Sequence, residues 1–360
     1  MFNDHLVVNG VVHPYNWDPS NYTNPLSGTF SEAGFGMQMM FAPGMRPGEY
    51  ALTHDEFMRD WTVEEIAWAT LGESDCDLMA YHSTPLTDFY ADGLVAVAKG
   101  SEGISRWPQR IPVYYGTVRP LEGQKAVDDF ERQVTEMGVN ALKLYPGFYR
   151  DGRTIAFKMN DERYAFPLFD KCRELGIKNV AIHKAIPFGV TAMDAYRPGD
   201  LDEAAMIYPD LNFQIIHAGW AFLEEMCFQL ARFPNVYANL EATFSYIVNT
   251  PRKFAEVIGQ LLFWGGPDKL IFGDGVSIVH PQPAIEKFKT FQFPDDIIEG
   301  QGVPPMTDEI RSKILGLNFL RIHELDEDEL KAGIEDDEFA QAKRDGLPAP
   351  WSHLRAAAVA

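Results

Sequence analysis

Eight short apolar segments alternate with longer amphipathic segments through most of this 360-residue chain. Apolar runs of about four to eight residues, bounded by turn-forming residues, are typical of strands buried on both faces of a parallel sheet. These segments span residues 6–13, 76–83, 111–118, 139–145, 179–183, 212–217, 235–241 and 269–274. Strand–helix units repeated in this way predict an α/β fold, a (β/α)8 TIM barrel, with an open doubly wound sheet as the alternative.

Helices are expected in most of the segments between these strands. Thr62 and Glu65 have the spacing of a capping box that begins a helix, and Gly138 and Gly176 are placed to end two others. The expected helices span residues 62–71, 88–100, 124–137, 163–175, 201–208, 222–233, 252–264, 283–290 and 307–315. No glycine-rich phosphate loop follows any expected strand, which disfavours nucleotide binding.

We expect one barrel domain over residues 1–325 with an N-terminal insertion and a C-terminal extension. The insertion, residues 16–60, is rich in Gly, Pro, Met and Phe and is too long for an ordinary connection, so it is interpreted as a lid or an interface segment. The C-terminal extension spans residues 326–360, and its acidic run at residues 326–337 is predicted to be a solvated tail rather than a site.

Composition excludes several functional classes. The formal charge of −21 argues against nucleic acids and anionic membrane surfaces, which need basic patches. Three cysteines without metal or redox spacing indicate buried thiols in a reducing compartment. There is no basic and then apolar leader and no run of eighteen apolar residues, so neither a signal peptide nor a membrane span is expected. We therefore expect a cytoplasmic protein.

Six side chains of metal-ligand type lie at or near the C-terminal ends of the expected strands, where parallel α/β folds carry their chemistry. They are His13, His82, His183, His217, Glu241 and Asp274. A single histidine at such a position is usually explained by hydrogen bonding in the core. Four of the nine histidines, gathered with two carboxylates, are not explained in this way. This nitrogen and oxygen set suits Fe, Mn or Zn. A catalytic zinc typically uses about three protein ligands. Six candidate ligands exceed that number, so we predict one or two divalent ions per chain and no other cofactor.

Three further residues are weaker candidates for binding a substrate. Lys143 lies on the fourth expected strand, where it is interpreted as a cation for a substrate carboxylate or for structure, or as a carboxylated lysine that bridges two metals. Tyr145 and Arg119 are placed to bind a carboxylate or hydroxyl, with a core tyrosine and a surface salt bridge as the alternatives.

Five sequence motifs carry a resemblance to a known family. They are Ala-Leu-Lys-Leu-Tyr-Pro at 141–146, Ile-His at 182–183, His-Ala-Gly at 217–219, Leu-Ile-Phe-Gly-Asp at 270–274 and Ile-Leu-Gly-Leu-Asn at 314–318. Together they resemble the amidohydrolase superfamily, in the branch of aminocarboxymuconate-semialdehyde decarboxylase and γ-resorcylate decarboxylase. The resemblance covers residues 1–325 and implies a metal held by a His-x-His pair on the first strand, a later histidine, and an aspartate after the eighth strand that also acts as acid and base.

The chain departs from this pattern in two places. Val11 stands where the first histidine of the pair is expected, so only His13 carries over. Asp274 lies one residue early, which points its side chain away from the site unless the strand has ended or bulges there. His82 and Glu241 are extra donors, so the ligand set is rearranged rather than lost.

Three functions follow from this set. The first is a dinuclear non-haem monooxygenase, resembling 2-aminoisobutyrate hydroxylase subunits, in which Glu241 bridges an Fe/Mn or Fe/Fe pair and O2 hydroxylates a small aliphatic or amino-acid substrate. The alternative is a Zn- or Mn-dependent decarboxylase or C–C hydrolase of a small carboxylic acid, with Asp274 or His183 moving protons. The third is a catalytically inert partner subunit. We rank the oxygenase first and expect a homo-oligomer or a hetero-oligomer with a related barrel subunit.

Overall fold

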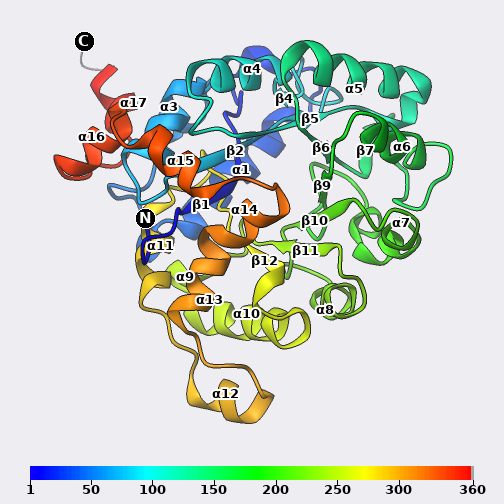
Figure 1. Cartoon of the computed structure of the whole chain (residues 1–360). Coiled ribbons are helices and arrows are strands. Elements are labelled where there is room, and N and C mark those ends of the chain that lie inside the picture. Colours follow the sequence, from blue (N-terminus) through cyan, green and yellow to red (C-terminus); the bar gives the residue numbers. More distant parts are fainter. Residues whose placement is uncertain (358–360) are drawn as a thin grey trace.

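An eight-stranded parallel sheet forms the centre of the computed structural model, which describes residues 1–357 (Figure 1). Its strands follow one another in chain order around the sheet, and the two hairpins β3–β4 and β7–β8 lie outside it. In order they are β1 (Val8–Val12), β2 (Leu78–His82), β5 (Val113–Thr117), β6 (Ala141–Leu144), β9 (Asn179–His183), β10 (Asn212–Ile216), β11 (Val236–Asn239) and β12 (Leu270–Ile271). This arrangement confirms the predicted (β/α)8 barrel.

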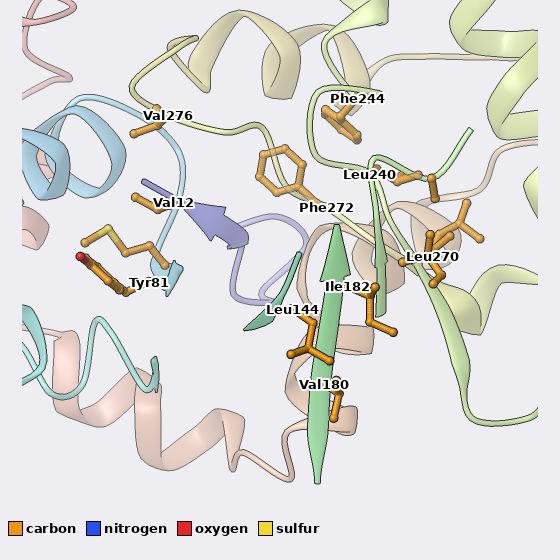
Figure 2. Packing of buried hydrophobic residues seen from close by; sticks show 14 of the residues in the cluster. Val12, Tyr81, Leu144, Val180, Ile182, Leu240, Phe244, Leu270, Phe272 and Val276 are labelled. Carbon is orange, nitrogen blue, oxygen red and sulfur yellow. The ribbon is translucent and has the colours of Figure 1, made fainter. Parts of the chain in front are cut away.

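The barrel closes between its first and last strands. The Gly10 N–H donates to the Phe272 carbonyl at 3.0 Å, and the His13 N–H donates to the Val276 carbonyl at 2.8 Å. Figure 2 shows Val12 near Val276 at this junction. A Cβ at Gly10 would lie 2.8 Å from the Phe272 carbonyl oxygen, so the close approach of the two strands requires glycine.

Helices surround the sheet, and no helix within residues 1–357 is both long and apolar enough to cross a membrane. The Thr62–Glu65 capping box is present, and Gly138 ends α5 in the left-handed conformation, as predicted. The helices between the insertion and the C-terminal extension are α3 (Val63–Ala67), α4 (Val97–Arg106), α5 (Gln124–Met137), α6 (Phe166–Glu174), α7 (Asp202–Ile207), α8 (Leu223–Arg232), α9 (Tyr246–Asn249), α10 (Pro251–Gly265), α11 (Gln282–Lys289), α12 (Asp295–Gln301), α13 (Asp308–Ser312) and α14 (Asn318–Ile322).

The expected helix over residues 88–100 is wrong. A hairpin of β3 (Thr84–Pro85) and β4 (Leu94–Val95) occupies this region, and α4 begins only at Val97. The Asp92 side chain accepts a hydrogen bond from the Leu94 N–H at 2.8 Å, and Gly93 has a φ of +81°. This local turn competes with helix formation and begins the returning strand. A second hairpin, β7 (Gly147–Arg150) with β8 (Arg153–Ala156), follows β6.

Side chains of the barrel strands pack in two layers. On the outside, Leu144 of β6 lies beside Val180 and Ile182 of β9, within the apolar layer between sheet and helices (Figure 2). On the inside, Ala141 and Ala181 leave room for larger groups. Because alternate residues of a strand face opposite sides, Lys143 and His183 point into the barrel.

The insertion contains α1 (Ser27–Phe41) and α2 (His54–Phe57) and is fixed at both ends of α1. At the start, Ser27 Oγ donates to the Phe89 carbonyl at 2.6 Å, and Ser31 Oγ lies 2.9 Å from the Tyr90 hydroxyl. At the end, Asn249 Nδ2 donates to the carbonyls of Met40 and Ala42 at 3.0 and 2.8 Å. Side chains of α1 also line the cavity at the C-terminal ends of the strands, so this helix lies at that end of the barrel, and we call residues 16–60 the lid.

The prediction of a solvated C-terminal tail is wrong for the described part of the extension. It folds into α15 (Glu327–Ile334), α16 (Glu338–Arg344) and α17 (Ser352–Ala357), which pack against the barrel (Figure 1). Phe339 and Trp351 are buried, and the acidic side chains of Asp326 and Asp337 cap α15 and α16. Many of the acidic residues therefore lie at the N-terminal ends of helices, which they stabilise. Residues 358–360 lie outside the described residues.

Candidate metal centre and active site

Five of the six predicted ligand side chains line one cavity of about 180 Å³ at the C-terminal ends of the strands. They are His13, His183, His217, Glu241 and Asp274. Tyr145 lines the same cavity, and its ring stacks on His183 with 4.8 Å between centroids. His82 lies behind the wall: its side chain is fully buried and stacks on Tyr115 with 3.9 Å between centroids.

His217 reaches the cavity through an unusual backbone conformation. Ile216 belongs to the core cluster inside the barrel, so simple alternation would point the next side chain outward. Instead His217 has a φ of +62°, and Ala185 and Ala242 after the neighbouring strands have φ values of +63° and +59°. Left-handed conformations cost non-glycine residues about 1–3 kcal/mol each and persist where the surroundings hold them. This left-handed backbone conformation turns the His217 imidazole toward the other donors.

Hydrogen bonds to carbonyl groups define which nitrogens of His183 and His217 carry lone pairs. His183 Nε2 donates to the Ile186 carbonyl at 2.7 Å, and His217 Nδ1 donates to the Glu241 carbonyl at 3.2 Å. Burial lowers the pKa of both imidazoles, to about 3 for His217, so both rings are neutral. His183 Nδ1 and His217 Nε2 are therefore both unprotonated, and they face each other at 3.1 Å. Two facing lone pairs repel unless a cation lies between them.

His13 presents a third lone pair by the same arrangement. Its Nδ1 donates to the His82 carbonyl at 2.8 Å, and burial, followed by the nearby Lys143, lowers its pKa. Its Nε2 lies 3.9 Å from Glu241 Oε1, while Glu241 Oε2 lies 3.4 Å from His217 Nε2. The Glu241 carboxylate thus lies between two neutral imidazoles.

The one-residue shift of Asp274 does not point its carboxylate away from the site. β12 ends at Ile271, so strand alternation no longer applies, and Asp274 lines the cavity. Its Oδ1 accepts from Asn9 Nδ2 at 2.7 Å and from the Val276 N–H at 3.0 Å, whereas its buried Oδ2 has no hydrogen-bond partner among residues 1–357. Burial raises the pKa of Asp274 to about 7, against the hydrogen bond from Asn9. Asn9 therefore positions one carboxylate oxygen and leaves the other available.

Lys143 is buried beneath the cavity and next to its donors. Its Nζ has no hydrogen-bond partner within the described chain and lies 5.2 Å from the centroid of the Tyr145 ring. Burial lowers the pKa of Lys143 to about 8, against the attraction of Glu241. Burial raises the pKa of Glu241 to about 7, while Lys143 acts to lower it. The two groups offset each other's charge beneath the donor cluster without forming an ion pair.

The donor chemistry fits a divalent cation. Among residues 1–357, no group of three or more His, Cys, Asp or Glu side chains is already arranged to hold a metal. The donors instead lie in pairs: His183 Nδ1 lies 3.1 Å and Glu241 Oε2 3.4 Å from His217 Nε2. Both separations are close to the ~3.3 Å that separates ligands of a tetrahedral zinc. The nitrogens on the far side of these imidazoles are held by carbonyl groups, as in metal sites. Glu241 Oε2 and Asp274 Oδ2 are buried without a hydrogen-bond partner in the described part of the chain. The residues present therefore fit a metal after small side-chain shifts.

The outer wall of the cavity is apolar. It is contributed by the lid and by loops after β9 and β12, and it includes Trp17, Phe30, Met37, Phe41, Ile186, Phe188, Ile278 and Val279. Phe30 of the lid meets Phe188 with 4.9 Å between ring centroids. The site thus has a polar floor and an apolar cover.

A model of the amidohydrolase family matches residues 104–322, more than half of the chain. This chain belongs to the amidohydrolase family. No protein of curated function matches it.

Solved structures with the same fold extend over nearly the whole of this amidohydrolase. A TIM-barrel protein from Bordetella bronchiseptica is 17% identical, with a TM-score of 0.59 over 88% of this chain and 97% of its own. A 2,6-dihydroxybenzoate decarboxylase with bound 2,6-dihydroxybenzoate is 13% identical, with a TM-score of 0.57 over 89% and 100%. A 5-carboxyvanillate decarboxylase from Novosphingobium aromaticivorans with bound manganese is 13% identical, with a TM-score of 0.56 over 89% and 98%. At these identities the likeness shows the fold.

Of the weaker candidates for substrate binding in this amidohydrolase, Arg119 lies away from the cavity. Arg119 pairs with Asp88 at 2.9 Å and lies over the Phe148 ring at 4.6 Å, which is the salt-bridge alternative. Val11, in the place of the family's first histidine, belongs to the apolar cluster inside the barrel and supplies no donor.

The sequence analysis missed several residues of the site. Tyr15 lines the cavity and stacks on His13 with 4.9 Å between centroids, and its position two residues after His13 was a usable signal. Asn9 lies four residues before His13 in the same expected strand and was also missed. The Met and Phe residues of α1 lie in the insertion that was expected to be a lid or an interface segment, but none was named as a site residue, because only the fold shows which of them line the cavity.

Proposed function

We propose that this amidohydrolase is a divalent-metal-dependent decarboxylase of a small carboxylic acid. The observation that carries the proposal is the pair of facing, unprotonated nitrogens of His183 and His217 beside Glu241, beneath an apolar lid. The named activities of two structural neighbours, both decarboxylases of aromatic carboxylates and one with manganese bound, support it. His13, His183, His217, Glu241 and Asp274 are the residues that would hold the metal or act beside it.

A bound divalent cation supplies Lewis acidity toward the substrate carboxylate and a neighbouring oxygen. Tyr15 and Tyr145 line the cavity, and neither hydroxyl forms a hydrogen bond within residues 1–357, so both can donate to substrate oxygens. Lys143 beneath the floor offsets the negative charge of Glu241 when an anionic substrate enters.

Loss of CO2 leaves a carbon that must receive a proton, and Asp274 is placed to deliver it. Asn9 holds Oδ1, and Oδ2 is the unpartnered oxygen of a carboxyl that lines the cavity. The raised pKa of Asp274 keeps part of the group protonated near neutral pH. The apolar lid limits water, so the proton comes from Asp274 rather than from solvent.

Decarboxylation is tested by CO2 release from a panel of hydroxybenzoates. Protein stripped with a chelator and reloaded with Mn, Zn or Fe is compared in air and under nitrogen. We expect release to be lost on stripping, to return with at least one metal, and to be equal with and without oxygen. Product that forms only in the presence of O2 would contradict the proposal. Release of a cleaved product without CO2 would instead favour the C–C hydrolase, which the same donors serve by activating water.

The dinuclear monooxygenase is the second candidate. Glu241 is positioned between His13 and His217 in the manner of a bridging carboxylate, and Val11 removes one ligand of the family's single-metal pattern. Neither the family nor the solved neighbours add support for an oxidoreductase or for iron. Mass spectrometry of the metal content separates the candidates: two ions per chain including Fe favour the oxygenase, one Mn or Zn favours the decarboxylase, and no metal favours the inert partner subunit. Assembly as a homo-oligomer, or with a related barrel subunit, stays a prediction.

A further inference from the structure

We propose that the cavity selects a substrate with a single anionic group whose remaining part is uncharged and apolar, and that Met37 of the lid determines this selection. The inference rests on the proposed function only in assuming that a carboxylate binds at the polar floor. It concerns the opposite end of the substrate, which the chemistry of decarboxylation does not specify.

Apart from a bound metal, the lining of the cavity offers an anion no cationic partner among residues 1–357. Its charged lining residues are Glu241 and Asp274, both acids, and no lysine or arginine of the described chain lines it. Lys143 is fully buried beneath the floor, and Arg119 is committed to Asp88 outside the cavity. A substrate with a second carboxylate would therefore place one of its anions against a wall without a cation.

The wall opposite the floor is formed by apolar side chains from three separate segments. Met37 comes from α1, Phe188 from the loop after β9, and Val279 from the loop after β12. With a cavity of only about 180 Å³, a small ring that binds at the floor also touches this wall. A carboxylate there loses its hydration without gaining a hydrogen bond, whereas a methyl group loses nothing.

Met37 is the position at which this selection can be inverted. It lines the cavity on the lid, whereas Met40 on the same helix is 50% exposed and does not line it. An arginine at position 37 brings a guanidinium to the apolar wall on a side chain of similar length. The same substitution at position 40 adds the same charge to the same helix outside the cavity and is the matched control.

The test is calorimetric binding to the manganese-loaded protein of benzoate, 3-methylbenzoate and benzene-1,3-dicarboxylate. These probes differ at one ring position. We expect the methyl compound to bind at least as tightly as benzoate and the dicarboxylate to bind about 100-fold more weakly, because its second anion is desolvated without a partner. M37R is expected to tighten dicarboxylate binding at least about 10-fold relative to benzoate, and M40R to leave the ratio unchanged.

Equal or tighter binding of the dicarboxylate to the unmodified protein would overturn the inference, as would failure to bind any of the three acids. The comparison on the unmodified protein stands whether or not M37R folds. The proposed reaction is tested separately by CO2 release. Selective binding without CO2 release supports the inference and contradicts decarboxylation, whereas CO2 release with unselective binding does the opposite.

Discussion

At the scale of single residues, the site depends on groups that aim its donors as much as on the donors themselves. The His217 backbone adopts a left-handed conformation, and Asn9 donates to Asp274 at 2.7 Å. Groups that hold a ligand or an acid in place typically affect metal affinity or activity about 10–100-fold when they are removed. Two substitutions test this dependence.

Asn9→Ala is expected to lower kcat about 10–100-fold with a small change in KM, because Asp274 loses the donor that positions Oδ1. The hydrogen bond from Asn9 lowers the pKa of Asp274, so its loss raises that pKa. An acid with a higher pKa stays protonated to higher pH, and the basic limb of the kcat profile should therefore move upward.

Asn140→Ala is the matched control for Asn9. Its side chain bonds the Tyr114 N–H at 2.8 Å and the Pro112 carbonyl at 2.9 Å, away from the cavity. The Asn140→Ala variant should be less stable, but the pH dependence of its kcat should be unchanged. A profile that does not move in Asn9→Ala would contradict the role given to Asn9.

Gly275→Ala is expected to weaken metal binding about 10–100-fold. A Cβ at this position would lie 2.6 Å from Glu241 Oε1, so the carboxylate must move away from its place between the imidazoles. Gly152→Ala is a close control, since Gly152 has a φ of +78° against +80° for Gly275 and no atom within 4 Å of the added Cβ. Isothermal titration with Mn2+ measures the difference, and equal affinities in the two variants would show that the clash is unimportant.

At the scale of elements, the lid decides what the barrel presents to a substrate. α1 is held at both ends by hydrogen bonds, and Phe30 meets Phe188 across the cavity. The cover is therefore a fixed part of the fold, and its side chains set the shape of the site.

Phe30→Ala is expected to weaken binding of 3-methylbenzoate about 10-fold, because an apolar contact of this size is lost from the cavity wall. Phe35→Ala is the control on the same helix, since Phe35 packs on Phe57 and His54 and does not line the cavity. Calorimetry on the metal-loaded variants compares them, with thermal unfolding to confirm that both are folded. A weaker complex in Phe35→Ala alone would contradict the assignment of the wall.

The strands and their terminal donors could be predicted from the sequence because each strand is a short apolar run with its polar residue at one end. β9 was predicted with its observed bounds, and Asp274 was left ambiguous because the end of β12 depends on closure against β1. The lid helix α1 could not be predicted. Its buried residues are Ser27, Ser31, Gly34, Gln38 and Phe41, mostly small or polar, so no apolar periodicity marks the helix.

At the scale of the whole molecule, the C-terminal extension is part of the fold. The buried carboxylate of Glu73 accepts hydrogen bonds from the Trp351 N–H at 2.6 Å, Ser352 Oγ at 2.7 Å and the His353 N–H at 3.1 Å. One side chain on the barrel thus holds the start of α17.

Glu73→Ala is expected to reduce the free energy of unfolding by about 2–4 kcal/mol, because several donors lose a charged acceptor in a buried place. Asp336→Ala is the control, since that side chain is 91% exposed and should change stability by about 0.5 kcal/mol or less. Urea unfolding measures both. Equal effects would show that the contact of Glu73 with residues 351–353 contributes little.

The same contact gives α17 a dependence on pH. Burial acts to raise the pKa of Glu73, but the nearby His280 imidazole and the hydrogen bonds from Ser352 and His353 outweigh it and the pKa is lowered. The stabilisation is therefore complete above the ordinary glutamate pKa of ~4.3 and is lost as the pH falls through the lower pKa of the folded state. Protection of the amides of residues 352–357, measured as the exchange rate relative to the intrinsic rate at each pH, should be lost only in this acid range, whereas loss of protection at neutral pH would contradict the assignment.

The bonds from Gly10 and His13 to Phe272 and Val276 also have a consequence for biosynthesis. On the ribosome, β1 emerges first, and β2 pairs with one of its edges early. The opposite edge has no native neighbour until residue 276 has been translated, so a hydrogen-bonding strand edge stays open during most of synthesis. Such an edge invites association between nascent chains. The barrel is therefore completed late, and truncated chains that end before β12 should aggregate.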